Sequence, residues 1–98
     1  MAKQTKITKS ARGQDCQIRI PGYCNRNPET VVFCHLSGGG IGAKVSDIHG
    51  AYGCSDCHDI VDRRVKAGRI AKEDIDLWFL EAVIRTQLLL IEQGLIKL

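Results

Sequence analysis

The chain of 98 residues carries 14 Lys and Arg residues against 11 acidic ones, and only 5 % of it is aromatic. This length allows one domain with a modest core, which a structural metal ion often supplements at this size. Residues 1–12 are polar and basic with no apolar run behind them, which argues against a secretory signal. No stretch reaches the roughly 18 apolar residues that a membrane helix needs. We therefore expect a soluble cytoplasmic protein.

The charge is divided unevenly along the chain. Residues 1–72 hold 12 basic and 6 acidic residues and so carry +6, whereas residues 73–98 hold 2 basic and 5 acidic ones and carry −3. A basic half of this kind favours a polyanionic partner such as nucleic acid, although a solvated basic surface has the same composition.

The chain divides into an N-terminal arm and one domain. Residues 1–14 are expected to form a flexible basic arm, whose cations recur every three residues as on one side of a helix: Lys3, Lys6, Lys9 and Arg12. Residues 15–98 are expected to form the domain, with a core over 15–68 and a C-terminal helix over 73–94.

The first half of the domain is expected to contain short strands and turns. Ile18 and Ile20 alternate with polar residues as in a strand, and Pro21-Gly22 predicts a turn that brings the flanking cysteines together. Residues 30–36 are β-branched and aromatic and form the best strand candidate. A second short strand is expected near 48–52.

A glycine-rich loop over 37–44 separates these two strands. It lacks the Gly-Lys-Ser/Thr ending of a phosphate loop, because Ala43 precedes Lys44 and Val45 follows it. We therefore expect a hairpin-type connection in which Lys44 could contact a phosphate.

Two helices are expected after the strands. The first covers about 56–67, is capped by Ser55 or Asp56, and presents cations that could hold phosphates: Arg63, Arg64 and Lys66, with Arg69 just beyond. The second, over about 73–93, is apolar around most of its circumference and must be covered on more than one side. We expect a homodimer through this helix; the alternative is that the front half and residues 95–98 cover it.

The strongest motif is Cys16-x7-Cys24 followed by Cys54-x2-Cys57. Four thiolates in two closely spaced pairs are typical of a closed structural zinc site. A thioredoxin-type pair is disfavoured because no βαβ pattern surrounds it, and a haem attachment run would leave the first pair unexplained.

The order of cysteines and histidines resembles the HNH endonucleases, which have the ββα-metal fold. The matching pieces are Cys16…Cys24, the run 31–36 ending in Cys34-His35-Leu36, and the run 54–59 that begins with Cys54. The resemblance is to the subgroup with a structural zinc, and especially to small HNH-like nucleases encoded by phages and prophages. It implies an α+β fold with a zinc-stapled ββα-metal core, followed here by the long C-terminal helix.

The same resemblance implies roles for single residues. His35 falls at the general base, His58 at a ligand of the catalytic divalent ion, and His49 at the central Asn that orients the base or closes the loop. Cys34 falls where many members have a second ligand, and Asp62 could complete the metal shell or orient His58. The ion would be Mg²⁺ or Mn²⁺, or Zn²⁺ if Cys34 binds it.

Three functions follow as hypotheses. The first is a metal-dependent DNA endonuclease that hydrolyses phosphodiester bonds in phage or prophage recombination or replication, in the cytoplasm of a bacterial host, with branched or structured DNA as a possible substrate. The second is a zinc-stabilised nucleic-acid-binding module without catalysis. The third is a protein-interaction adaptor that uses the apolar C-terminal helix.

Overall fold

The computed structural model describes residues 5–35, 48–62, 68 and 70–96, which form a small α+β unit. In chain order the elements are α1 (Lys6–Lys9), a 3₁₀ turn (Pro28–Thr30), β1 (Val32–His35), β2 (Gly50–Gly53), α2 (Ser55–Val61) and α3 (Lys72–Glu92). The expected α+β class with a long C-terminal helix is confirmed. None of the helices in the described ranges is both long enough and apolar enough to cross a membrane.

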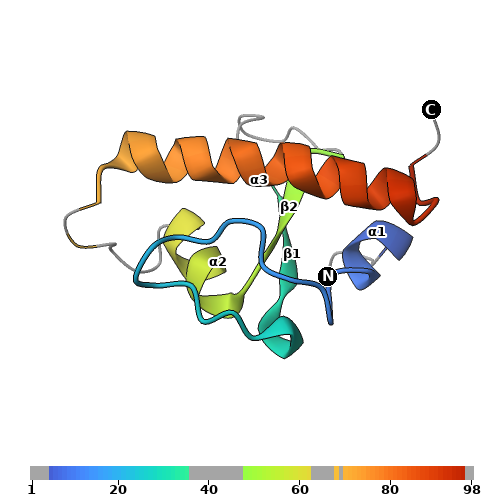
Figure 1. Cartoon of the computed structure of the whole chain (residues 1–98), viewed down its shortest axis with the longest axis horizontal. Helices are drawn as coiled ribbons and strands as arrows, with labels where there is room; N and C mark the ends of the chain where they lie inside the picture. The colour runs from blue at the N-terminus through green and yellow to red at the C-terminus, as the bar shows by residue number, and fades with distance from the viewer. Residues whose placement is uncertain (1–4, 36–47, 63–67, 69, 97–98) are drawn as a thin grey trace.

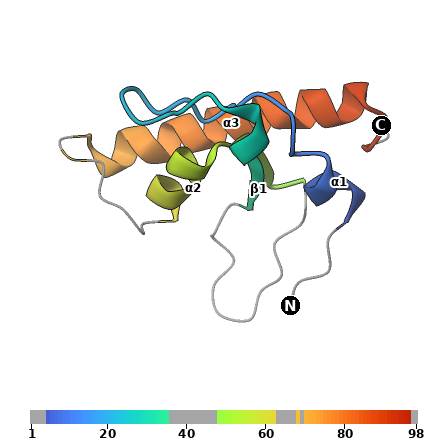
Figure 2. The same cartoon turned by 90° about the horizontal axis from the view of Figure 1, so that it is seen from below.

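The helix α3 lies along the whole unit and covers the other elements from one side (Figure 1). The helices α1 and α2 lie under opposite halves of α3, with the two strands between them, as both views show (Figures 1 and 2). The buried side of α3 consists of Phe79, Ala82, Val83, Thr86 and Leu90. This side packs chiefly against β2, which is buried along its whole length.

The sheet contains two antiparallel strands, in which Val32 pairs with Gly53 and His35 pairs with Gly50. The glycine at position 53 has a packing reason. A Cβ there would lie 2.6 Å from Cδ1 of Ile18 and 2.8 Å from Sγ of Cys34. β1 begins later than the expected range 30–36, because Pro28–Thr30 forms a 3₁₀ turn. β2 is shifted from the expected range 48–52, because Ile48 and His49 precede the paired residues.

The loop before the sheet corrects one expectation. Ile18 and Ile20 do not form a strand; both are buried, and so is Gln17, while Arg19 between the two isoleucines has a φ of 54°. A strand would send alternate side chains to opposite faces. Here the adjacent side chains of Gln17 and Ile18 are both buried, and the left-handed residue Arg19 turns the chain before Ile20.

The N-terminal segment also differs from the flexible arm that we expected over 1–14. Within its described part, Thr5 caps α1 with a capping box, Ala11 is 1 % exposed, and the Ser10 hydroxyl lies 2.7 Å from the Tyr52 hydroxyl. Since Tyr52 is fully buried in the core, these contacts fix α1 against the sheet.

The helix α3 is close to its expected range of 73–93, but its surface is unusual. Its exposed side carries four large apolar residues at 47–61 % exposure: Leu77, Leu80, Ile84 and Leu88. Their spacing places them on one face of the helix, opposite the buried side. We call this face the apolar stripe.

Candidate functional site

The four cysteines of the two sequence motifs converge on one point. One sulfur atom from each of Cys16, Cys24, Cys54 and Cys57 lies within 4.8 Å of the other three. All four are free thiols, three of them buried and Cys24 partly so. We call this group the cysteine cluster. In the part of the chain that the structure describes, it is the one group of three or more His, Cys, Asp or Glu side chains placed to hold a metal ion.

Local sequence explains how each pair forms. Cys54 is the N-cap of α2, and its Sγ accepts the backbone N–H of Cys57 at 3.4 Å, so one helical turn places both sulfurs together. In the first pair, the backbone N–H of Cys24 donates to the carbonyl of Ile20 at 3.0 Å. Gly22 has a φ of 79°, which fits the turn that Pro21-Gly22 predicts.

Backbone strain also points to the cluster. Arg19 and Arg26 both have a φ of 54°, a conformation that costs a non-glycine residue about 1–2 kcal/mol. The backbone N–H of Arg19 donates to the sulfur of Cys16, and that of Arg26 donates to the sulfur of Cys24. Two similar turns therefore direct amide dipoles at sulfur, an arrangement that stabilises a thiolate. No sequence pattern pointed to these two arginines, since glycine is the usual residue at positive φ.

The shifted pKa values of the thiols are consistent with a cation-binding site between the four sulfur atoms. A hydrogen bond from the Cys57 thiol lowers the pKa of Cys16 to about 4, and the same bond raises the pKa of Cys57. Burial raises the pKa of Cys24 to about 11. Cys16 and Cys57 thus share a thiol–thiolate hydrogen bond, and a metal ion bound to both sulfurs would displace its proton. Four sulfur donors at this spacing suit a soft tetrahedral ion, so the cluster could hold a metal such as zinc.

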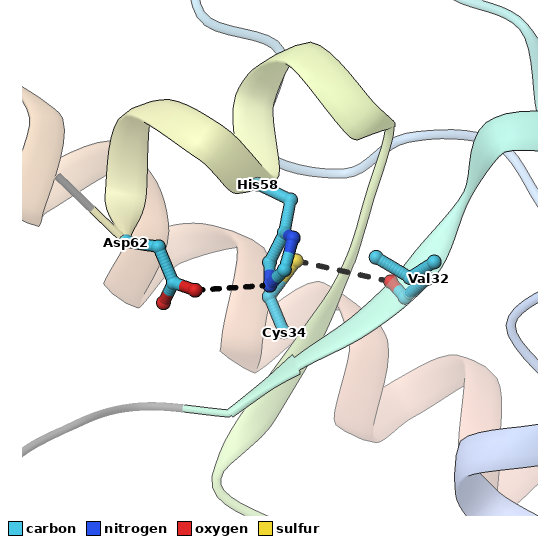
Figure 3. Close-up of polar contacts among 4 residues, drawn as sticks. All are labelled: Val32, Cys34, His58 and Asp62. Atoms are coloured by element: carbon cyan, nitrogen blue, oxygen red, sulfur yellow. Dashed lines mark hydrogen bonds and ion pairs between the residues drawn. The ribbon is translucent and has the colours of Figure 1, made fainter. Parts of the chain in front are cut away.

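The other end of α2 carries a second group of polar side chains. His58 Nε2 lies 3.4 Å from Asp62 Oδ2, one helical turn away, and the two side chains are 28 % and 38 % exposed. Figure 3 shows both on the side of α2 that faces β1. Asp62 ends the helix, with its N–H bonded to the His58 carbonyl. Imidazole and carboxylate here form a solvent-accessible pair, which we call the His–Asp pair.

Cys34 lies beneath this pair, on β1 (Figure 3), but belongs to the core. It is 1 % exposed, and its Sγ lies 3.8 Å from the carbonyl oxygen of Val32. Burial raises the pKa of Cys34 well above its ordinary value, so the side chain is a neutral thiol. It is not part of the cysteine cluster.

The two remaining histidines lie at one end of the sheet. His35 is the last residue of β1 and pairs with Gly50, and His49 directly precedes Gly50 in the chain; both histidines are exposed. The rings of His35 and Phe33 meet edge to face with centroids 5.1 Å apart. Phe33 was missed as a site residue, although its place two residues before His35 puts both on one face of the strand.

The predicted phosphate-binding residues lie outside the described residues. They are Lys44, Arg63, Arg64, Lys66 and Arg69. Their role in holding phosphates stays a prediction.

Comparison with known proteins adds a family. A family model described as "Putative nuclease YbcO" matches residues 5–95. Two curated relatives of that name, from Escherichia coli K12 and from Enterobacteria phage 82, are each 45 % identical over 97 residues, which span 93 % of this chain and 96 % of the relative. A solved structure titled as a putative bacteriophage protein from E. coli K-12 superposes with a TM-score of 0.77 at 40 % identity, over 90 % of this chain and 99 % of the other. The chain belongs to the YbcO family.

Proposed function

We propose that this protein is a metal-dependent DNA endonuclease of the HNH type. The family description and the names of the relatives support a nuclease. The observation that carries the proposal is the His–Asp pair on the side of α2 that faces β1, the strand that His35 ends. The element order β1, β2, α2 fits the ββα-metal arrangement.

In this proposal His35 is the general base. Its neutral imidazole takes a proton from a water molecule whose oxygen attacks phosphorus; the bond between phosphorus and the 3′-oxygen breaks, giving a 5′-phosphate and a 3′-hydroxyl. His58 and Asp62 would hold Mg²⁺ or Mn²⁺, which supplies charge stabilisation to the developing phosphorane and leaving oxygen. His49, which directly precedes the residue that pairs with His35, would orient the base or close the loop.

The cysteine cluster would hold a structural Zn²⁺ in this enzyme. It lies at the first turn of α2, and His58 follows Cys57 directly. Fixing that turn fixes the direction in which the His–Asp pair points, so the zinc would support catalysis without contacting substrate.

A second candidate function is nucleic-acid binding without cleavage. The buried neutral thiol of Cys34 favours it, because the usual hard ligand before the base is missing and only two described side chains remain for the catalytic cation. This candidate predicts DNA affinity with a steep salt dependence and no cleavage under any metal.

A cleavage assay tests the proposal. Purified zinc-loaded protein is incubated with plasmid, linear and branched DNA in Mg²⁺, Mn²⁺ or EDTA, beside His35→Ala. We expect metal-dependent nicking that His35→Ala lowers by about 10²–10⁴-fold at unchanged zinc content. Binding without cleavage in every metal would contradict the enzyme and favour the second candidate. A preference for branched DNA would fit a role in phage recombination.

We also propose a homodimer through the apolar stripe. In an antiparallel pair of α3 helices, a two-fold axis midway between Leu80 and Ile84 sets Leu80 opposite the second copy's Ile84 and places Leu77 within one residue of the second copy's Leu88. Four large apolar side chains at 47–61 % exposure form the kind of contiguous patch that marks an interface.

A further inference from the structure

A groove between α1 and β1 is not used by the proposed chemistry. It is an open groove with a volume of about 440 Å³. Its lining includes the charged residues Lys9, Arg12 and Glu29 and the apolar residues Val32 and Phe33. We call it the α1–β1 groove. A volume of this size is within the range of small-ligand sites and could take one nucleotide unit.

The two cations are held at the groove by the folded N-terminal segment. Ala11, between them, is 1 % exposed in the core, and Ser10 contacts the buried Tyr52 hydroxyl at 2.7 Å. Just after Arg12, the N–H of Gly13 donates to the carbonyl of Pro28 at 3.0 Å. Both cationic side chains are nevertheless exposed. A fixed backbone with solvated charged ends suits phosphate binding, because little backbone ordering is needed when the ligand arrives.

One aromatic side chain links the groove to the proposed general base. Phe33 lines the groove, and the ring of Phe33 contacts the ring of His35 with centroids 5.1 Å apart. A ligand that touches Phe33 is therefore separated from His35 by one ring contact. Val32, 41 % exposed, adds a second apolar side chain to the lining.

We propose that the α1–β1 groove binds a nucleotide that flanks the scissile phosphate of the DNA strand. Lys9 and Arg12 contact its phosphate, and Val32 and Phe33 support its sugar and base. The groove carries two cations against one acid, so it attracts a polyanion, and Glu29 opposes that attraction. This inference rests on the proposed function for the identity of the strand.

Binding titrations test the groove separately from catalysis. A fluorescein-labelled DNA 20-mer is titrated with the full zinc-loaded chain, without added Mg²⁺, over a series of KCl concentrations. The variants are Lys9→Ala, Arg12→Ala and Glu29→Gln. Lys72→Ala is the matched control, since it removes an exposed cation at the start of α3, at the opposite end of the molecule from α1 (Figure 1).

We expect Lys9→Ala and Arg12→Ala each to weaken binding by about 3- to 10-fold and to lower the slope of log Kd against log salt by about 1. Glu29→Gln should tighten binding, and Lys72→Ala should change it less than about 2-fold. Equal effects of Lys9→Ala, Arg12→Ala and Lys72→Ala on DNA affinity would contradict the proposal that the groove binds DNA.

Cleavage in Mg²⁺ then separates the two proposals. If the wild type cleaves DNA and the groove variants bind and cleave it equally well, the proposal that the groove binds DNA is wrong and the proposed nuclease function is supported. If the wild type binds DNA without cleaving it and the groove variants bind more weakly, DNA binding by the groove is supported and the proposed nuclease function is wrong.

Discussion

The two ends of α2 differ in almost every physical respect. At its first turn the cysteine cluster is largely buried, and backbone N–H groups donate to its sulfurs. At its last turn the His–Asp pair is about one third exposed and joined by a single 3.4 Å contact. A helix of seven residues thus separates a buried cysteine cluster from an accessible pair of polar side chains. In the proposed function, the first end would fix geometry and the second would meet substrate and solvent.

Removing a ligand of the cluster should have the largest effect. We expect Cys57→Ser to lose bound zinc and the cooperative thermal transition, because structural zinc contributes about 10–16 kcal/mol in small zinc domains, comparable to the whole stability of a domain. Metal analysis and thermal melts followed by circular dichroism measure both. Cys34→Ala is the control, a buried cysteine outside the cluster, and should keep its zinc. Stoichiometric zinc in Cys57→Ser would show that the cluster is not the zinc site.

A change at the other end of α2 should affect chemistry alone. We expect Asp62→Asn to lower cleavage at limiting Mg²⁺ by about 10–100-fold, because in the proposed function Asp62 would bind the ion or orient His58, which it contacts. Zinc content and melting temperature should stay the same, since Asp62 is exposed. Mg²⁺ titrations of the cleavage rate measure the effect. Asp59→Asn, an acid on the same helix, is the control, and an equal loss in both variants would argue against a specific pair.

A third change removes a hydrogen bond between α3 and β2, the packing that supports α2 as a whole. Thr86 on α3 is fully buried, and its hydroxyl accepts the backbone N–H of Tyr52 on β2 at 3.1 Å. Thr86→Val leaves that N–H without a partner and should lower the free energy of unfolding by about 1–3 kcal/mol, with zinc still bound. Thr86→Ser keeps the hydroxyl and should lose less. Urea unfolding compares the two; a more stable Thr86→Val would contradict the role of this bond.

The sequence predicted the positions of the clustered cysteines more completely than those of the histidines. Cys54-x2-Cys57 predicts its own geometry, since one turn at a helix start brings the two sulfurs together, and the structure joins Cys16 and Cys24 to them. The strand predicted around Ile18 was wrong because Arg19 adopts a positive φ, in which its backbone N–H donates to the sulfur of Cys16. This tertiary contact is not contained in the strand propensities of the residues. The His–Asp pair was partly predictable from its four-residue spacing. The α1–β1 groove was not predictable, because the N-terminal segment is held by the contact of Ser10 with Tyr52, 42 residues further along the chain.

The apolar stripe on α3 gives the smallest expected effect on either end of α2. Ile84 is 61 % exposed, so Ile84→Glu should change the stability of the folded protomer by no more than about 0.5 kcal/mol and leave zinc content unchanged. In an antiparallel pair, however, the new carboxylate would face the apolar stripe of the second copy and lose its hydration, which disfavours the dimer. Light scattering coupled to size-exclusion chromatography should therefore give the mass of a dimer for the wild type and of a monomer for Ile84→Glu. Asp76→Asn, an exposed change on the same helix outside the stripe, should leave the mass at that of the dimer. A monomeric wild type would instead leave the stripe open to solvent in the free protein and exclude pairing through α3 as the reason for its apolar surface.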